Sequence, residues 1–238
     1  MLLSCMNAAP PSASYLVLSP DPPRNAMNYA SCIAGLGNPG EKYQNTRHNL
    51  GFAMLDALLE ECSRTGQVEQ LSGNKFKCSL WRYRIPGSNS WHLVAKPMTY
   101  MNLSGEALQP LLHWHQMSAE QLLVVHDELD FKPGIVRFKF GGGAAGHNGL
   151  ASIIQQFGTQ NFYRLRIGIG RIASYDAAQW VLTPPTPDER PLLEKAIRTA
   201  LKGIMLFAEQ GPAAAMNLIH SLPPPDPGNT QPPPVHQQ

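Results

Sequence analysis

The segment QLLVVHDEL (residues 121–129) constrains the fold of this chain more than any other part of the sequence. Four consecutive aliphatic residues lead into acids, which predicts a short strand that is apolar on both faces. Such strands occur in parallel sheets that helices cover on both sides. Because strand-like and helical patterns alternate along the chain, we expect a single α/β domain with a largely parallel sheet and helices on both faces.

The spacing of apolar residues predicts the other elements. Leu50, Met54, Leu58 and Cys62 recur every four residues, which predicts a helix over 49–62. Ser104 is a candidate N-cap for a second helix. The remaining expectations are a hairpin formed by 76–85 and 91–97, strands at 28–37, 135–140 and 162–170, and helices at 104–116, 148–157 and near 188–210.

The two ends of the chain lack such patterns. Residues 1–26 are rich in Pro, Ser and Ala, and the tail from residue 223 is rich in Pro, so we expect both to be disordered around a domain over 27–222. The four cysteines form no C-x-x-C pair, which favours a reducing, cytoplasmic setting over a zinc site or a disulfide framework. No apolar run approaches the ~20 residues of a membrane span.

A glycine-rich segment, GGGAAGHNG at residues 141–149, contains the G-x-G-x-x-G spacing of a dinucleotide-binding loop. Such a loop also needs an acid about 20 residues further on, to bind the ribose hydroxyls. No Asp or Glu occurs from Phe131 to Tyr175, so we do not expect a nucleotide cofactor. The spacing of an NTPase phosphate loop is also absent.

The same acid-free stretch concentrates positive charge, although the net charge of the whole chain is only +2. One interpretation is scattered, solvated side chains. The other is a face that binds nucleic-acid phosphates, which glycines would allow to approach the backbone closely. Strand alternation places Arg137 with Lys139 on one face, and Arg164 with Arg166 on one face. The six basic residues are Lys132, Arg137, Lys139, Arg164, Arg166 and Arg171.

His48 and Asp127 are the candidate acid–base pair. His48 comes just before a predicted helix, and capping by Asn45 or Thr46 would place it near the positive helix end and favour the neutral imidazole. Asp127 ends the buried strand at the sheet edge where ligands bind. A carboxylate there would fix the imidazole tautomer and leave the other ring nitrogen as a base. A structural histidine and a strand-end carboxylate are the alternatives.

Asparagines occur at the same predicted strand ends, at Asn38, Asn102 and Asn148. An amide donates and accepts hydrogen bonds at once, which suits a peptide-like substrate, although each residue alone also suits a turn. His147 is either a further polar site residue or a helix-start cap. The chain has no G-x-S-x-G serine motif, no cysteine in the setting of a nucleophile, and no helical histidine pair suited to one metal ion.

Together these segments closely resemble the bacterial-type peptidyl-tRNA hydrolase family. The resemblance covers 28–222 and rests on GLGNPGEKYQNTRHNLGF, KPMTYMNLSG, VVHDELDFKPGIVRFKFGGGAAGHNGL and FYRLRIGIGR. It implies a twisted mixed sheet and hydrolysis of the ester that joins a peptide to tRNA, by water and without a metal or organic cofactor. It also implies that peptidyl-tRNA is the partner, and we expect a monomer without a membrane association.

The resemblance also implies roles for individual residues. His48 matches the catalytic base, Asp127 the group that orients it, and Asn38 a group that acts on the substrate. Binding of the substrate's peptide and of the catalytic water is implied for Asn38, Asn102, Asn148 and Met101. Tyr43 and His147 match positions that line the same cleft. Binding of tRNA phosphates is implied for Arg137, Lys139, Arg164 and Arg166.

Two features depart from the family pattern. Family members often read GGGxGGHNG, commonly with His at x, where this chain has Ala144 and Ala145. The family's loop mobility or substrate gating is therefore not carried over to this chain, whereas the base and its partner are. The family also usually begins just before the first strand, where Met27 stands. We therefore expect either translation from Met27 or an organelle-targeting extension over 1–26.

Two other functions remain open at this point. One is a non-enzymatic RNA-binding splicing cofactor of chloroplasts built on the same fold. The other is an esterase acting on small N-acyl esters, which leaves the basic stretch without a role. The complete set of Asn38, His48, Asn102 and Asp127 favours the tRNA-releasing enzyme over the splicing cofactor.

Overall fold

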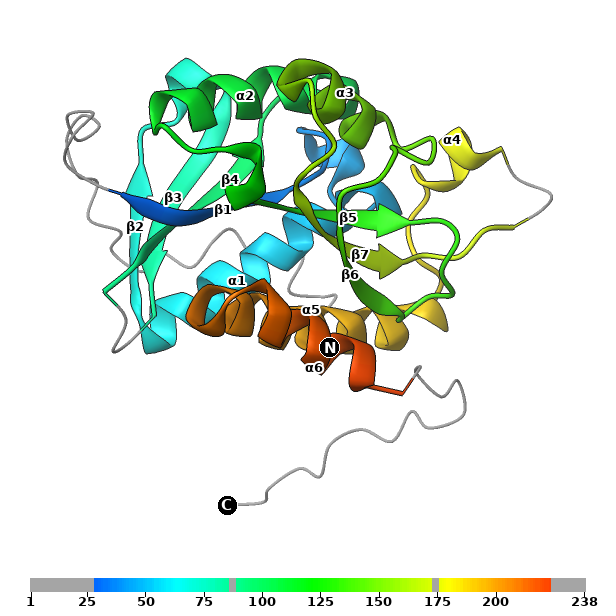
Figure 1. Ribbon diagram of the computed structural model, residues 1–238. Helices are drawn as coiled ribbons and strands as arrows, with labels where there is room; N and C mark the ends of the chain where they lie inside the picture. Colours follow the sequence, from blue (N-terminus) through cyan, green and yellow to red (C-terminus); the bar gives the residue numbers. More distant parts are fainter. Residues whose placement is uncertain (1–27, 86–88, 173–175, 224–238) are drawn as a thin grey trace.

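A seven-stranded sheet forms the centre of the computed structural model, which describes residues 28–85, 89–172 and 176–223 (Figure 1). The strand order is β2-β3-β4-β1-β5-β7-β6. β4, β1, β5 and β7 run parallel, whereas β2, β3 and β6 pair antiparallel at the two edges. The strands are β1 (Tyr29–Gly35), β2 (Gln67–Leu71), β3 (Cys78–Arg84), β4 (Trp91–Pro97), β5 (Leu122–Glu128), β6 (Val136–Phe140) and β7 (Tyr163–Gly168).

Helices cover both faces of this sheet. α2 and α3 lie on one face, and α1, α5 and α6 lie on the other, with α4 beyond the strands (Figure 1). None of the helices in the described residues is long and apolar enough to cross a membrane. The helices are α1 (Leu50–Thr65), α2 (Ser104–Trp114), α3 (Asn148–Phe157), α4 (Ala177–Trp180), α5 (Glu189–Gln210) and α6 (Pro212–Ser221).

The expected α/β architecture is confirmed, and among the described strands parallel pairing between neighbours is confined to β4, β1, β5 and β7. Every expected strand and helix is present, but β2, α4 and α6 were not expected. The prediction that Ser104 caps α2 is wrong, because its hydroxyl donates to the carbonyl of Met101 (2.8 Å) and Leu103 is the N-cap residue. The extension over 1–26 and the Pro-rich tail from residue 224 lie outside the described residues.

Strand alternation divides the core into two layers. Ile33 and Leu123 pack with α1, α5 and α6, whereas their neighbours Ala34 and Val124 pack with α2 and α3. All four side chains are fully buried. The strands must therefore be apolar on both faces, as the segment that ends in Asp127 indicated.

Two glycines bring the start of α1 against the end of β1. A Cβ atom on Gly35 would lie 2.3 Å from the carbonyl oxygen of Gly51, and one on Gly51 would lie 2.4 Å from the amide nitrogen of Leu36. No other residue type fits at such distances. This contact places the 3-10 turn Arg47–Asn49, which directly precedes α1, beside the ends of the central strands.

Arg47 links this turn, through hydrogen bonds and an ion pair, to the segment between α4 and α5. Its guanidinium donates to the carbonyls of Thr183 (3.1 Å) and Pro184 (2.8 Å), forms an ion pair with Glu189, and stacks 3.5 Å from the ring of Trp180. The residue is only 1% exposed. Since the planar guanidinium makes all these contacts at once, a lysine cannot reproduce them.

We predict that Arg47→Lys lowers the free energy of unfolding by about 2 kcal/mol, because several hydrogen bonds and the stacking disappear while the charge remains. Urea unfolding measures the effect. Arg64→Lys is the matched control: Arg64 pairs with Glu61 on the exposed surface of α1, and its replacement should cost less than about 0.5 kcal/mol. Equal losses of stability in the two variants would contradict the anchoring role.

Candidate active site

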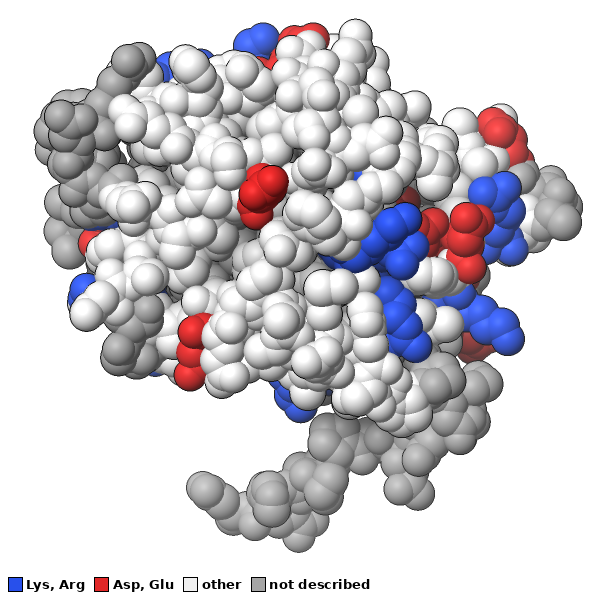
Figure 2. Space-filling view, viewed as in Figure 1, with Lys and Arg blue, Asp and Glu red and all other residues white. Residues whose placement is uncertain are grey.

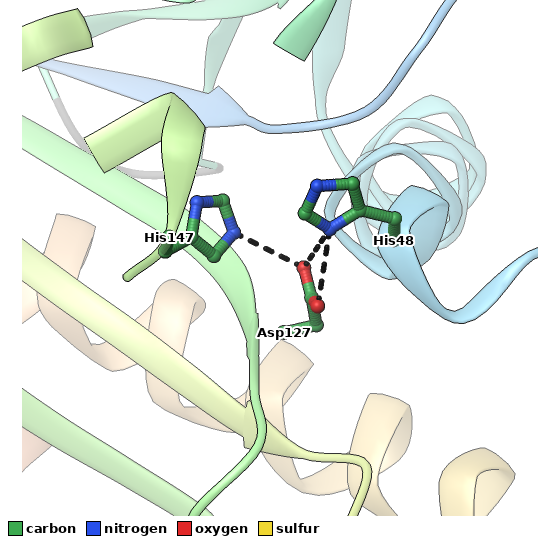
Figure 3. A group of neighbouring side chains, drawn as sticks. All are labelled: His48, Asp127 and His147. Carbon is green, nitrogen blue, oxygen red and sulfur yellow. Dashed lines mark hydrogen bonds and ion pairs between the residues drawn. The ribbon is translucent and has the colours of Figure 1, made fainter. Parts of the chain in front are cut away.

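Asp127 is the centre of the candidate site. It lies near the carboxyl end of β5, and its side chain is 1% exposed. Nδ1 of His48 lies 3.0 Å from Oδ1 and 3.1 Å from Oδ2 of Asp127, and Nε2 of His147 lies 3.1 Å from Oδ1. Figure 3 shows both imidazoles pointing to this carboxylate from separate segments. One buried anion therefore accepts hydrogen bonds from two rings.

His48 lies in the turn before α1, as expected, but the predicted cap is wrong. Neither Asn45 nor Thr46 caps a helix through its side chain; the Thr46 hydroxyl donates to the carbonyl of Tyr43 instead (2.7 Å). The backbone N–H of His48 donates to the carbonyl of Val181 (2.8 Å). Since Nδ1 faces Asp127, Nε2 is the nitrogen that remains to take a proton.

His147 combines both roles that the sequence left open. It is the N-cap residue of α3, and its Nδ1 accepts from the backbone N–H groups of Gly149 (3.1 Å) and Leu150 (3.4 Å). A nitrogen that accepts from N–H carries no proton itself. The proton of the neutral ring is therefore on Nε2, which donates to Asp127.

The electrostatics of the cluster favour an ionised Asp127. Burial alone would raise the pKa of this carboxyl, but the imidazoles of His48 and His147 outweigh burial and hold the pKa well below its usual value. Burial, reinforced by His147, lowers the pKa of His126 to about 3. The neutral His126 ring donates from Nδ1 to the backbone carbonyl of Asp127 (2.7 Å), which fixes the main chain there.

Asn38 and Asn49 join the end of β1 to the start of α1. The backbone N–H of Asn38 donates to Oδ1 of Asn49 (2.8 Å), and Nδ2 of Asn49 donates to the carbonyl of Asn38 (2.9 Å). Oδ1 of Asn38 accepts from the backbone N–H of Met101 (2.7 Å). This bond fixes the orientation of the Asn38 amide, so that Nδ2 is the group left to donate to a substrate.

Three other predicted substrate residues, Asn102, Asn148 and Tyr43, are exposed or half-buried. Asn102 is exposed in the turn Met101–Leu103, which packs against α3, and Asn148 is the exposed first residue of that helix. Tyr43 is half-buried in the turn Glu41–Tyr43, and the structure shows no hydrogen bond from it to another of these residues.

A pocket of about 290 Å³ opens beside the cluster. Its walls are the end of β5, the glycine-rich loop and the region of α4. Among the predicted site residues, His48, Asp127, His147 and Asn148 line it. The remaining lining residues are His126, Glu128, Leu129, Ala144, Ala145, Gly146, Asp176, Ala177, Ala178 and Val181.

Arg137 lies on the same face as Lys139, and Arg164 on the same face as Arg166, as strand alternation predicted, and the structure brings the two pairs onto one face of the sheet. Arg137 pairs with Arg166, and Lys139 pairs with Arg164, across the two antiparallel strands. Figure 2 shows Lys and Arg side chains gathered over this part of the molecule, with acidic side chains beside them. Arg166 lies 3.7 Å from Glu128, whereas Lys139 is exposed.

Arg164 differs from its neighbours because it is 2% exposed. Its guanidinium donates to the carbonyls of Gly142 and Gly143, so it anchors the glycine-rich loop rather than facing solvent. Burial, reinforced by Arg166, lowers its pKa to about 10, which leaves it charged near pH 7. We therefore leave Arg164 out of the surface that would contact phosphates.

The loop itself contains one strained residue. Gly141, Gly142 and Gly146 have φ values of 68°, 97° and 80°, and Ala145 has φ 48°. Glycine adopts these left-handed conformations freely, whereas alanine does so at a cost of about 1 kcal/mol. Ala145 thus occupies a position whose backbone suits glycine.

The cluster has the residue types of a metal site, but its hydrogen bonds indicate that the ring nitrogens facing Asp127 hold protons and not a metal ion. One ligand atom each from His48, Asp127 and His147 lies within 4.8 Å of the others. However, Nδ1 of His147 already accepts backbone N–H groups, so a metal ion on Nε2 would require an imidazolate. The observed distances of 3.0 and 3.1 Å are those of ordinary hydrogen bonds.

Sequence reasoning missed two residues of this site. Asn49 orients Asn38, and His126 fixes the backbone of Asp127. Each lies next to a predicted catalytic residue, in NTRHN and in VVHDEL, which is the signal that was available. Neither segment shows which side chain turns inward.

Comparisons with known proteins agree on one family. The family model for peptidyl-tRNA hydrolase matches residues 32–226. Peptidyl-tRNA hydrolase of Desulfovibrio desulfuricans is 49% identical over 193 residues, which is 81% of this chain and 84% of that protein. The corresponding protein of Delftia acidovorans is 42% identical and covers 84% of this chain and 94% of its own length.

A solved structure shows the same fold. The crystal structure of peptidyl-tRNA hydrolase from Acinetobacter baumannii superimposes with a TM-score of 0.74 at 38% identity, over 83% of this chain and 97% of that one. These matches span the strands, the Asp127 cluster and the basic face together. The chain belongs to the peptidyl-tRNA hydrolase family.

Proposed function

We propose that His48 is the general base with which this chain performs the activity of its family, the release of tRNA from peptidyl-tRNA. The observation that carries the proposal is the pair formed by Nδ1 of His48 and the buried carboxylate of Asp127. Asp127 fixes the tautomer and stabilises the imidazolium that forms after proton transfer. Nε2 is then available to take a proton from water.

The remaining steps use groups around this pair. The activated water attacks the ester carbonyl, and the oriented Nδ2 of Asn38 donates to the developing oxyanion. The ribose hydroxyl leaves with the tRNA. We assign contacts with the peptide to Met101, Asn102, Asn148 and Tyr43, and contacts with tRNA phosphates to Arg137, Lys139 and Arg166.

Two alternatives receive less support from the structure. An RNA-binding protein without activity has no need for a buried carboxylate that orients an imidazole. An esterase for small substrates leaves the basic face of β6 and β7 without a role. Release of peptide from N-blocked aminoacyl-tRNA, with free aminoacyl-tRNA as the control substrate, separates these functions.

We also propose that the enzyme works in the cytoplasm. The described cysteines Cys32, Cys62 and Cys78 are buried free thiols, as expected in a reducing compartment. That the chain acts as a monomer stays a prediction.

A first prediction from the proposed mechanism concerns the base. His48→Asn keeps a donor for Asp127 but has no group that takes a proton at the position of Nε2, so kcat should fall by about 100-fold or more. Affinity for tRNA should stay within about twofold, because the residues that bind phosphates lie elsewhere. Steady-state hydrolysis and a tRNA binding titration measure the two. His113→Asn, at an exposed position of α2, is the control. Near-normal turnover of the His48 variant would reject the assignment.

The second prediction concerns the basic face. Neutralising Lys139 and Arg137 to Gln should weaken tRNA binding. The slope of log K against log salt, which is negative, should become less steep by about 0.7 to 0.9 for each phosphate that the protein no longer neutralises. Lys195→Gln is the matched control, since Lys195 is exposed on α5, on the other face of the sheet. An unchanged slope in the double variant would show that tRNA binds elsewhere.

The third prediction concerns the glycine-rich loop. Ala145→Gly should raise the free energy of unfolding by about 0.5 kcal/mol, because relief of the left-handed strain exceeds the entropy gained by the unfolded chain. Ala144→Gly should lower it, since Ala144 has no positive φ and packs against the core of α2 and α3. Urea unfolding of both variants tests this, and kcat shows whether the strain limits turnover. Equal effects would mean that the φ of Ala145 carries no strain.

A further inference from the structure

His147 connects the first turn of α3 to the carboxylate on which the proposed base depends. Its Nδ1 accepts from the N–H of Gly149, and its Nε2 lies 3.1 Å from Oδ1 of Asp127. We propose that His147 is a positioning residue: it holds Asp127 through a tautomer that α3 enforces, and it thereby sets the pH range in which His48 works as a base. This inference rests on the proposed function of His48.

The tautomer of His147 gives this residue a role different from that of His48. The backbone N–H of Gly149 points at Nδ1, so a proton on that nitrogen would oppose a donor and break the cap of α3. Nε2 therefore carries the proton and is turned to Asp127. With its side chain 9% exposed and both nitrogens engaged, His147 has no nitrogen available to take a proton from water.

The two imidazoles share one acceptor atom. Oδ1 of Asp127 lies 3.0 Å from Nδ1 of His48 and 3.1 Å from Nε2 of His147, whereas Oδ2 lies 3.1 Å from His48 alone. A hydrogen bond to a carboxylate oxygen stabilises the anion, and it weakens the hydrogen bond that the same carboxylate can accept from a second donor. Because His147 also donates to Asp127, the carboxylate stabilises the protonated form of His48 less than it would without the His147 hydrogen bond.

The other titratable groups that the structure describes near the cluster do not bond to the Asp127 carboxylate. His126 packs edge-on to His147, with ring centroids 4.9 Å apart, but donates to the backbone of Asp127. Glu128 faces Arg166, and Arg164 faces the glycine-rich loop. Asp176, before α4, lines the pocket. In the described residues, the hydrogen bonds to the Asp127 carboxylate come from His48 and His147.

Two substitutions test the roles of the two ring nitrogens of His147 separately. In His147→Asn, the amide oxygen takes the place of Nδ1 and keeps the cap of α3, but no donor reaches Asp127. In His147→Gln, the amide nitrogen takes the place of Nε2 and keeps the donor to Asp127, but the cap is removed. The experiment measures kcat and KM for N-blocked aminoacyl-tRNA across pH, together with the melting temperature, for both variants, for wild type and for His48→Asn.

The two variants should differ in the acid limb of the kcat profile. His147→Asn should keep the KM of wild type, while its acid limb moves to higher pH by about one unit, the scale of one hydrogen bond to a carboxylate. His147→Gln should melt at a lower temperature and keep the acid limb of wild type.

Three outcomes would overturn the proposal. An unmoved acid limb in His147→Asn would leave His147 as a helix cap only. A raised KM with an unmoved limb in both variants would make it a substrate-binding residue. The same shift in both variants would show that Nε2 is not the relevant atom. The His48→Asn variant keeps the two proposals apart: if it is inactive while His147→Asn shows no shift, only the role of His147 fails, whereas turnover by His48→Asn overturns both.

Discussion

A buried carboxylate sets the constraint on which the site depends. Removing a carboxylate from water costs several kcal/mol unless hydrogen bonds compensate for the missing hydration. Asp127 meets this requirement through His48 and His147, which come from segments about 80 and 20 residues away in the sequence. The turn before α1, the end of β5 and the start of α3 must therefore meet at one place. The close contact of Gly35 with Gly51 makes the first of these meetings possible.

Two buried arginines hold the walls around this cluster. Arg47 anchors the segment that follows α4, and Arg164 anchors the glycine-rich loop, in both cases through backbone carbonyls. Segments without regular structure have few contacts of their own, so a guanidinium with several fixed donors gives them a defined position. The pocket is thus shaped by cations that lie behind its walls. Such residues are separate from Lys139, which is exposed and free to meet an anionic ligand.

The fold was largely predictable because periodicity reports on burial, and the two-sided apolar strand ending in Asp127 excluded most other architectures. The pairing of His48 with Asp127 followed from the rule that strand ends meet at one edge of the sheet. Strand alternation placed Arg164 on the same face as Arg166 but did not predict that its side chain is buried, because its burial depends on the glycine-rich loop that packs over it. The prediction of a cap at Thr46 was wrong because the Thr46 hydroxyl donates to the carbonyl of Tyr43 instead. Such competition between neighbouring partners is not encoded in spacing.

The glycine-rich loop shows why the same spacing serves different chemistry. In a dinucleotide-binding loop the backbone presents N–H groups to a phosphate at a helix N-terminus. Here the carbonyls of Gly142 and Gly143 turn inward to the Arg164 guanidinium, and the first N–H groups of α3 are used by the ring of His147. The donors that would bind a phosphate are therefore committed to the protein itself. The loop and the start of α3 orient the imidazole of His147 instead. This imidazole donates to Asp127, so the anion next to this helix terminus is a side chain of the protein and not a phosphate.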